Sequence, residues 1–169
     1  MKNTARRSRR GLAATPRGVF EGYASLFSVP DSGGDIVMPG AFAASLARRR
    51  PENVRMLFQH DPAQPIGRWL DIHEDARGLY VRGQLSLDVQ RASELCGLLR
   101  DGAIDGLSIG FRTIVASRPR KPAHRKLLKI DLWEISLVTF PMLAGARVSA
   151  VKAHRPPPAQ AIANPAYPL

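Results

Sequence analysis

Three residues in separate segments have side chains that could act together in catalysis. His60 ends an apolar run, Ser108 has a glycine two residues away on either side, and Glu134 interrupts a strongly apolar stretch. A histidine can accept a proton near neutral pH, a serine becomes a nucleophile when a base takes its proton, and a carboxylate can hold an imidazole in one tautomer. These residue types predict a serine hydrolase, whereas a turn histidine, a serine in a glycine-kinked strand and a carboxylate exposed at a sheet edge are the structural alternatives.

The order of the three residues separates this chain from the α/β-hydrolases. The spelling Gly106-x-Ser108-x-Gly110 matches the nucleophile elbow of lipases and esterases, but that motif needs a helix directly after the serine. Here a strand-like segment follows, and the best histidine precedes the serine. The elbow is therefore not favoured, and we interpret the two glycines as room for a substrate backbone to approach the Ser108 hydroxyl.

Metal and cofactor sites are not expected. No two histidines have helical metal-ligand spacing, there is no phosphate-binding loop, and the lone Cys96 lies on an apolar helix face, where it is expected to be a packing residue. Asp31 and Asp35 flank two glycines and could bind a cation, but a turn explains them more simply.

Length and composition indicate one domain. The chain has 169 residues with 44% hydrophobic residues, enough to build a core without disulfides. No apolar run is long enough to cross a bilayer, and residues 1–10 are basic without a following apolar segment, so neither a membrane span nor a secretory signal is expected. The single cysteine suits a reducing cytoplasm.

The formal net charge of +11 is concentrated in residues 1–17 and 112–129, which contain basic residues and no acid. Such blocks attract polyanions, so weak nonspecific contact with nucleic acid is one interpretation and a solvated arm and loop are the other. Neither block has aromatic residues for base stacking, which argues against a specific nucleic-acid reader.

The chain divides into three parts. Residues 1–16 are expected to form a basic flexible arm, 17–152 a folded domain, and 153–169 a proline-rich flexible tail. Within the domain, period-two alternation or a composition rich in aromatic and β-forming residues predicts strands, and an apolar helical face predicts helices. The strands are expected at 19–27, 79–86, 107–111 and 127–140, and the helices at 41–50, stopped by Pro51, and at 89–100, with Asp88 as N-cap and Gly102 at the C-terminal end. This is a mainly β, α+β domain, a compact barrel or sandwich with helices at its edges.

Eight short segments taken in order resemble the prohead (capsid maturation) proteases of tailed phages. The likeness covers about residues 17–152. The segments are 22–27 (GYASLF), 34–37 (GDIV), 39–42 (PGAF), 57–61 (LFQHD), 65–67 (PIG), 78–81 (GLYV), 107–111 (LSIGF) and 134–141 (EISLVTFP).

The resemblance implies a serine protease related in fold to herpesvirus assemblin, a β-barrel surrounded by helices. Such enzymes are packaged inside the assembling procapsid in the bacterial host cytoplasm, trim the scaffold or the major capsid protein, and often cut themselves. It also implies that Ser108 is the nucleophile, His60 the general base and Glu134 the third member, with His73 as the alternative. The Gly110 backbone and Arg112 are candidate oxyanion donors.

Two other classes of function stay open. A non-enzymatic capsid-assembly or scaffold protein would use the basic arms to bind acidic partners. A sequence-neutral nucleic-acid binder would depend on the net charge and bind in a strongly salt-dependent manner. Under the protease hypothesis, we expect self-cleavage in one or both arms and allow for self-association.

Overall fold

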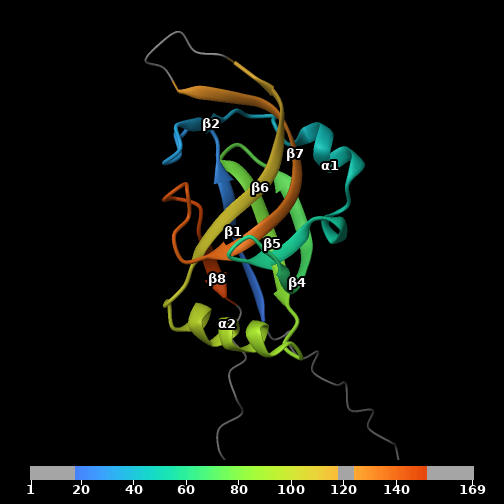
Figure 1. The fold of residues 1–169 in the computed structure, drawn as a ribbon, viewed down its shortest axis with the longest axis vertical. Coiled ribbons are helices and arrows are strands. Elements are labelled where there is room, and N and C mark those ends of the chain that lie inside the picture. Colours follow the sequence, from blue (N-terminus) through green and yellow to red (C-terminus); the bar gives the residue numbers. More distant parts are fainter. Residues whose placement is uncertain (1–17, 118–123, 152–169) are drawn as a thin grey trace, which may run out of the picture.

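The computed structural model describes residues 18–117 and 124–151 (Figure 1). In these residues a β-rich fold carries two α-helices and one short 3₁₀-helix, η1. The elements in chain order are β1 (Val19–Leu26), β2 (Asp35–Val37), α1 (Ala43–Arg48), η1 (Pro51–Asn53), β3 (Arg55–Phe58), β4 (Asp61–Glu74), β5 (Gly78–Leu85), α2 (Gln90–Arg100), β6 (Gly106–Ala116), β7 (Arg125–Val138) and β8 (Val148–Val151). None of the helices described is long and apolar enough to span a bilayer.

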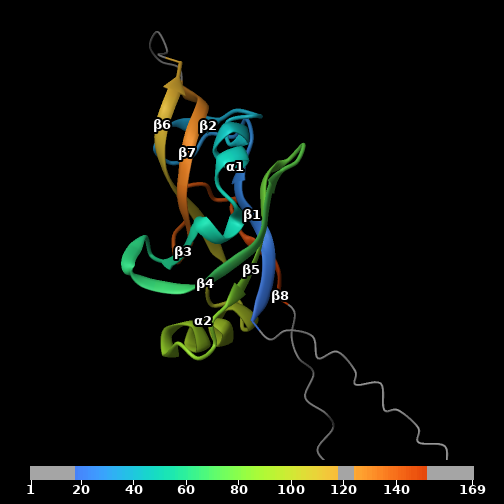
Figure 2. The same cartoon turned by 90° about the vertical axis from the view of Figure 1, so that its right-hand side faces the viewer.

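The strands form one curled sheet in the order β2-β7-β3-β4-β5-β1-β8, and β6 pairs with β7 (Figure 2). β7 pairs in parallel with β2 and β3, and the other neighbours are antiparallel. The expected mainly β fold with helices at its edge is thus confirmed. The central position of β7, which contains Glu134, brings β3 to one side of this strand and β6 to the other.

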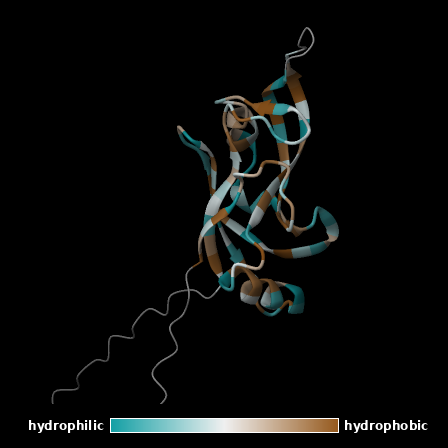
Figure 3. Cartoon of the chain, turned by 90° about the vertical axis from the view of Figure 1, so that its left-hand side faces the viewer, coloured by the Kyte–Doolittle hydropathy of each residue, from teal (hydrophilic) through white to brown (hydrophobic). Residues whose placement is uncertain are grey.

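The core lies on the inner face of the curled sheet. Period-two alternation places one set of side chains inside and the other outside, and Figure 3 shows this change of polarity along the strands. Leu79 and Val81 of β5 and Leu107 of β6 are fully buried, and the rings of Phe20 and Trp69 meet edge to face at 5.7 Å. Each large apolar side chain buried in this way contributes about 1.5–3 kcal/mol.

Both helices form where the sequence predicts them, but their ends differ. α1 covers only the middle of the expected range. α2 begins at Gln90 with Val89 as its N-cap residue, so the prediction of Asp88 as N-cap is wrong. The C-terminal prediction is confirmed, because Gly102 has φ +71°, a conformation that glycine adopts without strain.

The strand β4 was not expected. Its 14 residues include Pro62 and Pro65, and the apolar Trp69, Leu70 and Ile72 of its second half do not alternate strictly with polar residues, so its pattern is not that of a typical strand. Antiparallel pairing with β3 in its first half and with β5 from Gly67 onward overrides this weak local preference. The predicted arms at 1–16 and 153–169 lie outside the described residues, and the domain boundaries stay a prediction.

Candidate active site

His60 lies in the two-residue turn that joins β3 to β4. Phe58 pairs with Asp61, so Gln59 and His60 form the turn, and their φ values are +54° and +59°. Positive φ at both positions is the pattern of a type I′ hairpin, which favours Asn-Gly; for other residues it costs roughly 1–2 kcal/mol each. The turn therefore precedes the Asp61-Pro62 pair that suggests a turn in the sequence.

The neighbouring strand β7 holds this strained turn in place. The backbone N–H of Gln59 donates to the carbonyl of Leu137 at 2.9 Å, and its side-chain amide donates to the hydroxyl of Thr139 at 2.7 Å. The backbone N–H of His60 donates to Oγ of Ser136 at 3.1 Å. These contacts compensate the unfavourable backbone conformation and fix the direction of the imidazole, as expected for strain at a functional site.

The imidazole of His60 contacts the carboxylate of Glu134. Nδ1 lies 2.5 Å from Oε1 of Glu134, and the Ser136 hydroxyl donates to Oε2 at 2.7 Å. An ionised carboxylate only accepts hydrogen bonds, so Nδ1 carries the proton and Nε2 is left as the proton acceptor. Glu134 therefore selects the tautomer that a general base requires.

The same contact changes the acidity of His60. The hydrogen bond to Glu134 raises the pKa of the imidazole above its ordinary value of about 6.5, partial burial acts in the opposite direction, and the charge of Glu134 adds to the increase. The imidazole is thus a stronger base than an isolated histidine.

Ser108 lies on β6 on the same face of the sheet as Glu134. In the antiparallel β6–β7 pair, Ser108 is opposite Ser136 and Gly110 is opposite Glu134. Residues directly opposite each other project from the same face. The fold therefore places Ser108 next to the serine that contacts both His60 and Glu134, and all three predicted site residues converge on one region.

Ser136 is a site residue that was not singled out from the sequence. It follows Glu134 by two residues, and this spacing on a strand is the signal that puts the two side chains on one face. Ser136 is fully buried, whereas Ser108 retains 7% exposure. Its hydroxyl accepts from the His60 backbone and donates to Glu134, so Ser136 is a positioning residue and not a candidate nucleophile.

The glycines beside Ser108 have a different role from the one expected. A Cβ atom at Gly110 would lie 2.0 Å from Oε1 of Glu134, and one at Gly106 would lie 2.5 Å from the carbonyl oxygen of Val138. The interpretation of these glycines as room for a substrate backbone is wrong. They make room for the side chain of Glu134 and the backbone of β7.

Gly110→Ala should therefore lower the rate by about 10²-fold, because Glu134 must move away from His60 and small displacements of a catalytic group carry losses of this size. The measurement is kcat/KM for peptide cleavage, together with thermal unfolding. Gly97→Ala is the matched control, since a Cβ at this position on α2 meets open space. Equal activity of the two variants would show that the contact between Gly110 and Glu134 has no catalytic importance.

A pocket of about 200 Å³ adjoins the nucleophile candidate. It borders β6 from Leu107 to Phe111 and includes Ser108. Its other walls come from β1, the region around β2, and Met142 and Leu143. Most of these residues are apolar. Leu107, Ile109 and Phe111 alternate with Ser108 along β6 and so project from the other face of the strand, and neither His60 nor Glu134 lines this pocket.

The alternative third residue, His73, lies elsewhere in the site's sheet. Its Nδ1 is 3.1 Å from Oδ2 of Asp71, and its ring lies 5.0 Å from that of Tyr80. Glu134, and not His73, contacts His60. Arg112, a candidate oxyanion donor, has its guanidinium 3.8 Å from Asp131, four residues along β6 from Ser108.

The remaining candidates have structural roles. Cys96 is partly buried and packs against the core, which confirms its predicted packing role. Oδ1 of Asp31 accepts from the backbone N–H groups of Gly33 and Asp35 at 2.9 Å each, and Asp35 pairs with Arg125. This is the turn geometry that the simpler interpretation of the two aspartates predicts.

Known proteins resemble this chain in sequence and in fold. The sequence model described as caudovirus prohead serine protease matches residues 3–157. The prohead protease of Enterobacteria phage HK97 is 41% identical over 138 residues, which are 80% of this chain and 61% of that protein. The chain thus spans less than two thirds of the length of this relative.

Two solved structures show the same architecture. The capsid assembly protease of bacteriophage T4 has a TM-score of 0.59 at 14% identity, over 71% of this chain and 80% of that one. The protease of Kaposi's sarcoma herpesvirus, in complex with a hexapeptide phosphonate inhibitor, has a TM-score of 0.53 at 15% identity, over 77% and 63%. The expected assemblin-like fold is confirmed, and with the match to residues 3–157 it follows that this chain belongs to the caudovirus prohead serine protease family.

Proposed function

We propose that the protein is a serine endopeptidase that uses Ser108 as nucleophile and His60 as general base. Glu134 orients the imidazole of His60 and raises its pKa. The observation that carries the proposal is the 2.5 Å contact between His60 Nδ1 and Glu134 Oε1 on the sheet face where Ser108 lies. This contact leaves Nε2 as a proton acceptor, and it resembles the arrangement that activates serine in unrelated hydrolases.

The reaction follows from these positions. Nε2 of His60 takes the hydroxyl proton as Oγ of Ser108 forms a bond to the peptide carbonyl carbon. The imidazolium then gives this proton to the leaving amine as the C–N bond breaks. In the second step His60 takes a proton from a water molecule as its oxygen bonds to the acyl carbon, and returns this proton to Oγ of Ser108 as the acyl C–O bond breaks. Glu134 stabilises the imidazolium in both steps, and Ser136 keeps the carboxylate in position.

The substrates are the scaffold or major capsid protein of the phage, cleaved inside the assembling procapsid in the bacterial host, and the chain itself at its terminal arms. Family membership and the 41% identity to a prohead protease support this assignment. The proposal also includes self-association of the protease and weak nonspecific contacts of its basic segments with nucleic acid.

A serine-directed fluorophosphonate probe tests the proposal. We expect a phosphonyl adduct on Ser108 in the wild-type protein, mapped by mass spectrometry, and strongly reduced labelling in His60→Ala because the hydroxyl loses its base. In parallel, co-expression with the capsid and scaffold proteins encoded by neighbouring phage genes should shorten one of these proteins. An adduct at another serine would exclude the proposed nucleophile, and unchanged partner lengths together with absent labelling would favour the non-enzymatic assembly protein.

A further inference from the structure

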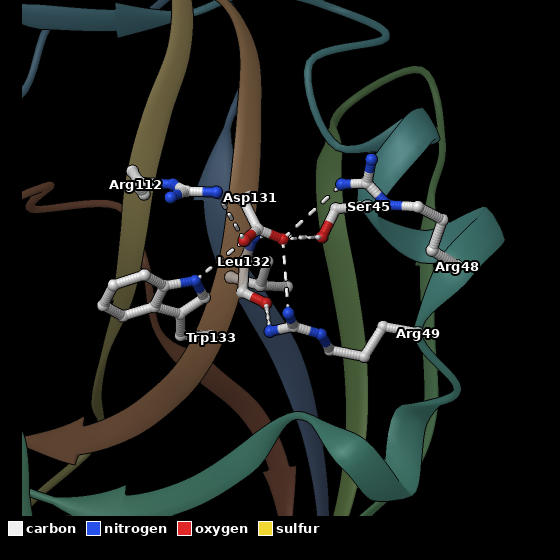
Figure 4. A network of polar contacts seen from close by, with 7 residues as sticks. All are labelled: Ser45, Arg48, Arg49, Arg112, Asp131, Leu132 and Trp133. Carbon is white, nitrogen blue, oxygen red and sulfur yellow. Dashed lines mark hydrogen bonds and ion pairs between the residues drawn. The ribbon is translucent and has the colours of Figure 1, made fainter.

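Three arginines surround one buried aspartate beside the proposed active site (Figure 4). The guanidinium groups of Arg49, Arg48 and Arg112 lie 3.4, 3.7 and 3.8 Å from the carboxylate of Asp131. Arg49 contacts Oδ1 of Asp131, and the indole N–H of Trp133 donates to Oδ2 at 2.9 Å. We name these three arginines with Asp131 and Trp133 the arginine cluster.

The arginine cluster lies on the same face of the sheet as Ser108. Ser108, Gly110 and Arg112 alternate along β6, so their side-chain directions coincide. Across the ladder, Arg112 is opposite Asp131 as Gly110 is opposite Glu134, with one register shift between the two pairs. Four strand residues span roughly 13 Å, so an extended peptide that reaches Ser108 along β6 also passes the cluster.

The cluster has more positive charge than its aspartate requires. Arg49 is the least exposed of the arginines and donates both to Asp131 and, at 2.6 Å, to the carbonyl of Leu132. Arg48 and Arg112 lie beyond hydrogen-bond distance, and their side chains are 63% and 64% exposed. One carboxylate faces three guanidinium groups, which leaves a surplus of two positive charges whose donors are open to solvent.

The negative partner at the centre of the cluster stays ionised. The hydrogen bond from Trp133 lowers the pKa of Asp131, burial opposes this, and Arg49, Arg112 and Arg48 lower it further. The ionised Asp131 attracts the guanidinium groups of Arg48 and Arg112 toward the cluster before any ligand arrives, which reduces the entropy lost on binding. Trp133, whose surface is 50% exposed, adds an apolar face next to them.

We propose that Arg48 and Arg112, positioned by Asp131, form a subsite for an acidic side chain of the substrate, three to five residues from the bond that is cleaved. Guanidinium groups bind carboxylates through paired, charge-assisted hydrogen bonds, and an aspartate or glutamate would neutralise the surplus charge. The subsite rests on the proposed function, since its distance is counted from Ser108. It selects substrates without taking part in the chemistry.

The test uses the full-length protein and a peptide library made by digesting a bacterial proteome. New termini are identified by mass spectrometry after incubation with wild type, Arg48→Gln/Arg112→Gln, and Arg100→Gln as a control. Arg100 is exposed on α2, which Figure 1 places at the opposite end of the molecule from α1. Arg49 stays in place in all variants, so Asp131 keeps a partner and the unfolding temperature should change little.

We expect wild type and Arg100→Gln to enrich Asp and Glu three to five residues from the cleaved bond. For matched Glu and Gln peptides made from such a site, the wild-type preference in kcat/KM should be about five- to tenfold and should decrease with added salt, as for partly exposed ion pairs. The double variant should lose the preference. Arg48→Gln alone, which leaves Arg112 in place, should weaken the preference and keep its activity on the Gln peptide. Absence of acidic enrichment in wild type, or its persistence in the double variant, would overturn the subsite.

A binding measurement keeps this question separate from the proposed function. Ser108→Ala protein on a resin should retain acidic peptides of the same library, and Ser108→Ala combined with Arg48→Gln/Arg112→Gln should not. Cleavage that persists after Ser108→Ala would contradict the nucleophile assignment but leave the acidic selectivity measurable. Equal retention of acidic and neutral peptides by both proteins would contradict the subsite alone.

Discussion

Ser108→Ala should reduce cleavage of co-expressed capsid protein by on the order of 10³-fold or more, to the point where processing is no longer seen. The hydroxyl is the only group of the site that forms a covalent bond in the proposed reaction, and removing one member of a unit that acts together removes most of its catalysis. Intact-mass spectrometry of the capsid protein at fixed times after induction measures the effect. The same samples report whether the protease chain itself stays at full length.

Ser108 retains only 7% exposure. The substitution deletes one oxygen atom and keeps the buried Cβ atom, so the fold of this variant should be unaffected. Its thermal unfolding should lie close to that of wild type. Ser93→Ala, on the exposed side of α2, is the matched control and should process normally. Normal processing by Ser108→Ala would assign the nucleophile to another residue.

The sequence predicts the elements that have strong local signals. β5 and the first half of β6 alternate clearly between apolar and polar residues, β1 and β7 are rich in aromatic or β-branched residues, and both helices have an apolar face, so their positions follow from local pattern. β4 has no such pattern, since its first half contains two prolines and the apolar residues of its second half do not alternate strictly. Pairing with β3 on one side and with β5, the next strand along the chain, on the other side stabilises it as a strand.

The residues of the site are predictable by type, but their arrangement is not. His60, Ser108 and Glu134 stand out because each is a polar residue in an apolar or glycine-rich setting. Their convergence depends on β7 lying between β3 and β6, a non-local pairing that no local pattern encodes. The turn at Gln59-His60 was also hidden, because positive φ is rare for these residues and here depends on β7.

The roles of Gly110 and Ser136 also could not be predicted from the local sequence. From the sequence, the glycine is a gap beside a nucleophile and the serine is one more strand residue. In the structure, the Glu134 side chain occupies the space over Gly110, and Ser136 joins Glu134 to the His60 backbone. Cross-strand register decides both roles, and register is set by the whole sheet.

Glu134→Gln should lower the rate by on the order of 10³-fold and also move its pH dependence. The amide can donate to Nδ1 of His60 and so favour the tautomer that has its proton on Nε2, where a base cannot accept another. Because Glu134 raises the pKa of His60, and the base must be neutral, wild-type kcat/KM should fall on the acid side around a pH above the ordinary histidine value of about 6.5. Without the carboxylate the pKa decreases, so the acid limb of the variant should lie at lower pH.

A pH profile of kcat/KM for wild type, Glu134→Gln and Glu52→Gln separates this role from a general structural one. Glu52 is exposed on η1, and its substitution should leave both the plateau and the acid limb unchanged. A merely structural Glu134 would predict a lower plateau with an unmoved limb, because the fraction of folded protein scales the whole curve. A shift toward lower pH together with the lower plateau is the result that a direct contact between Glu134 and the catalytic imidazole requires.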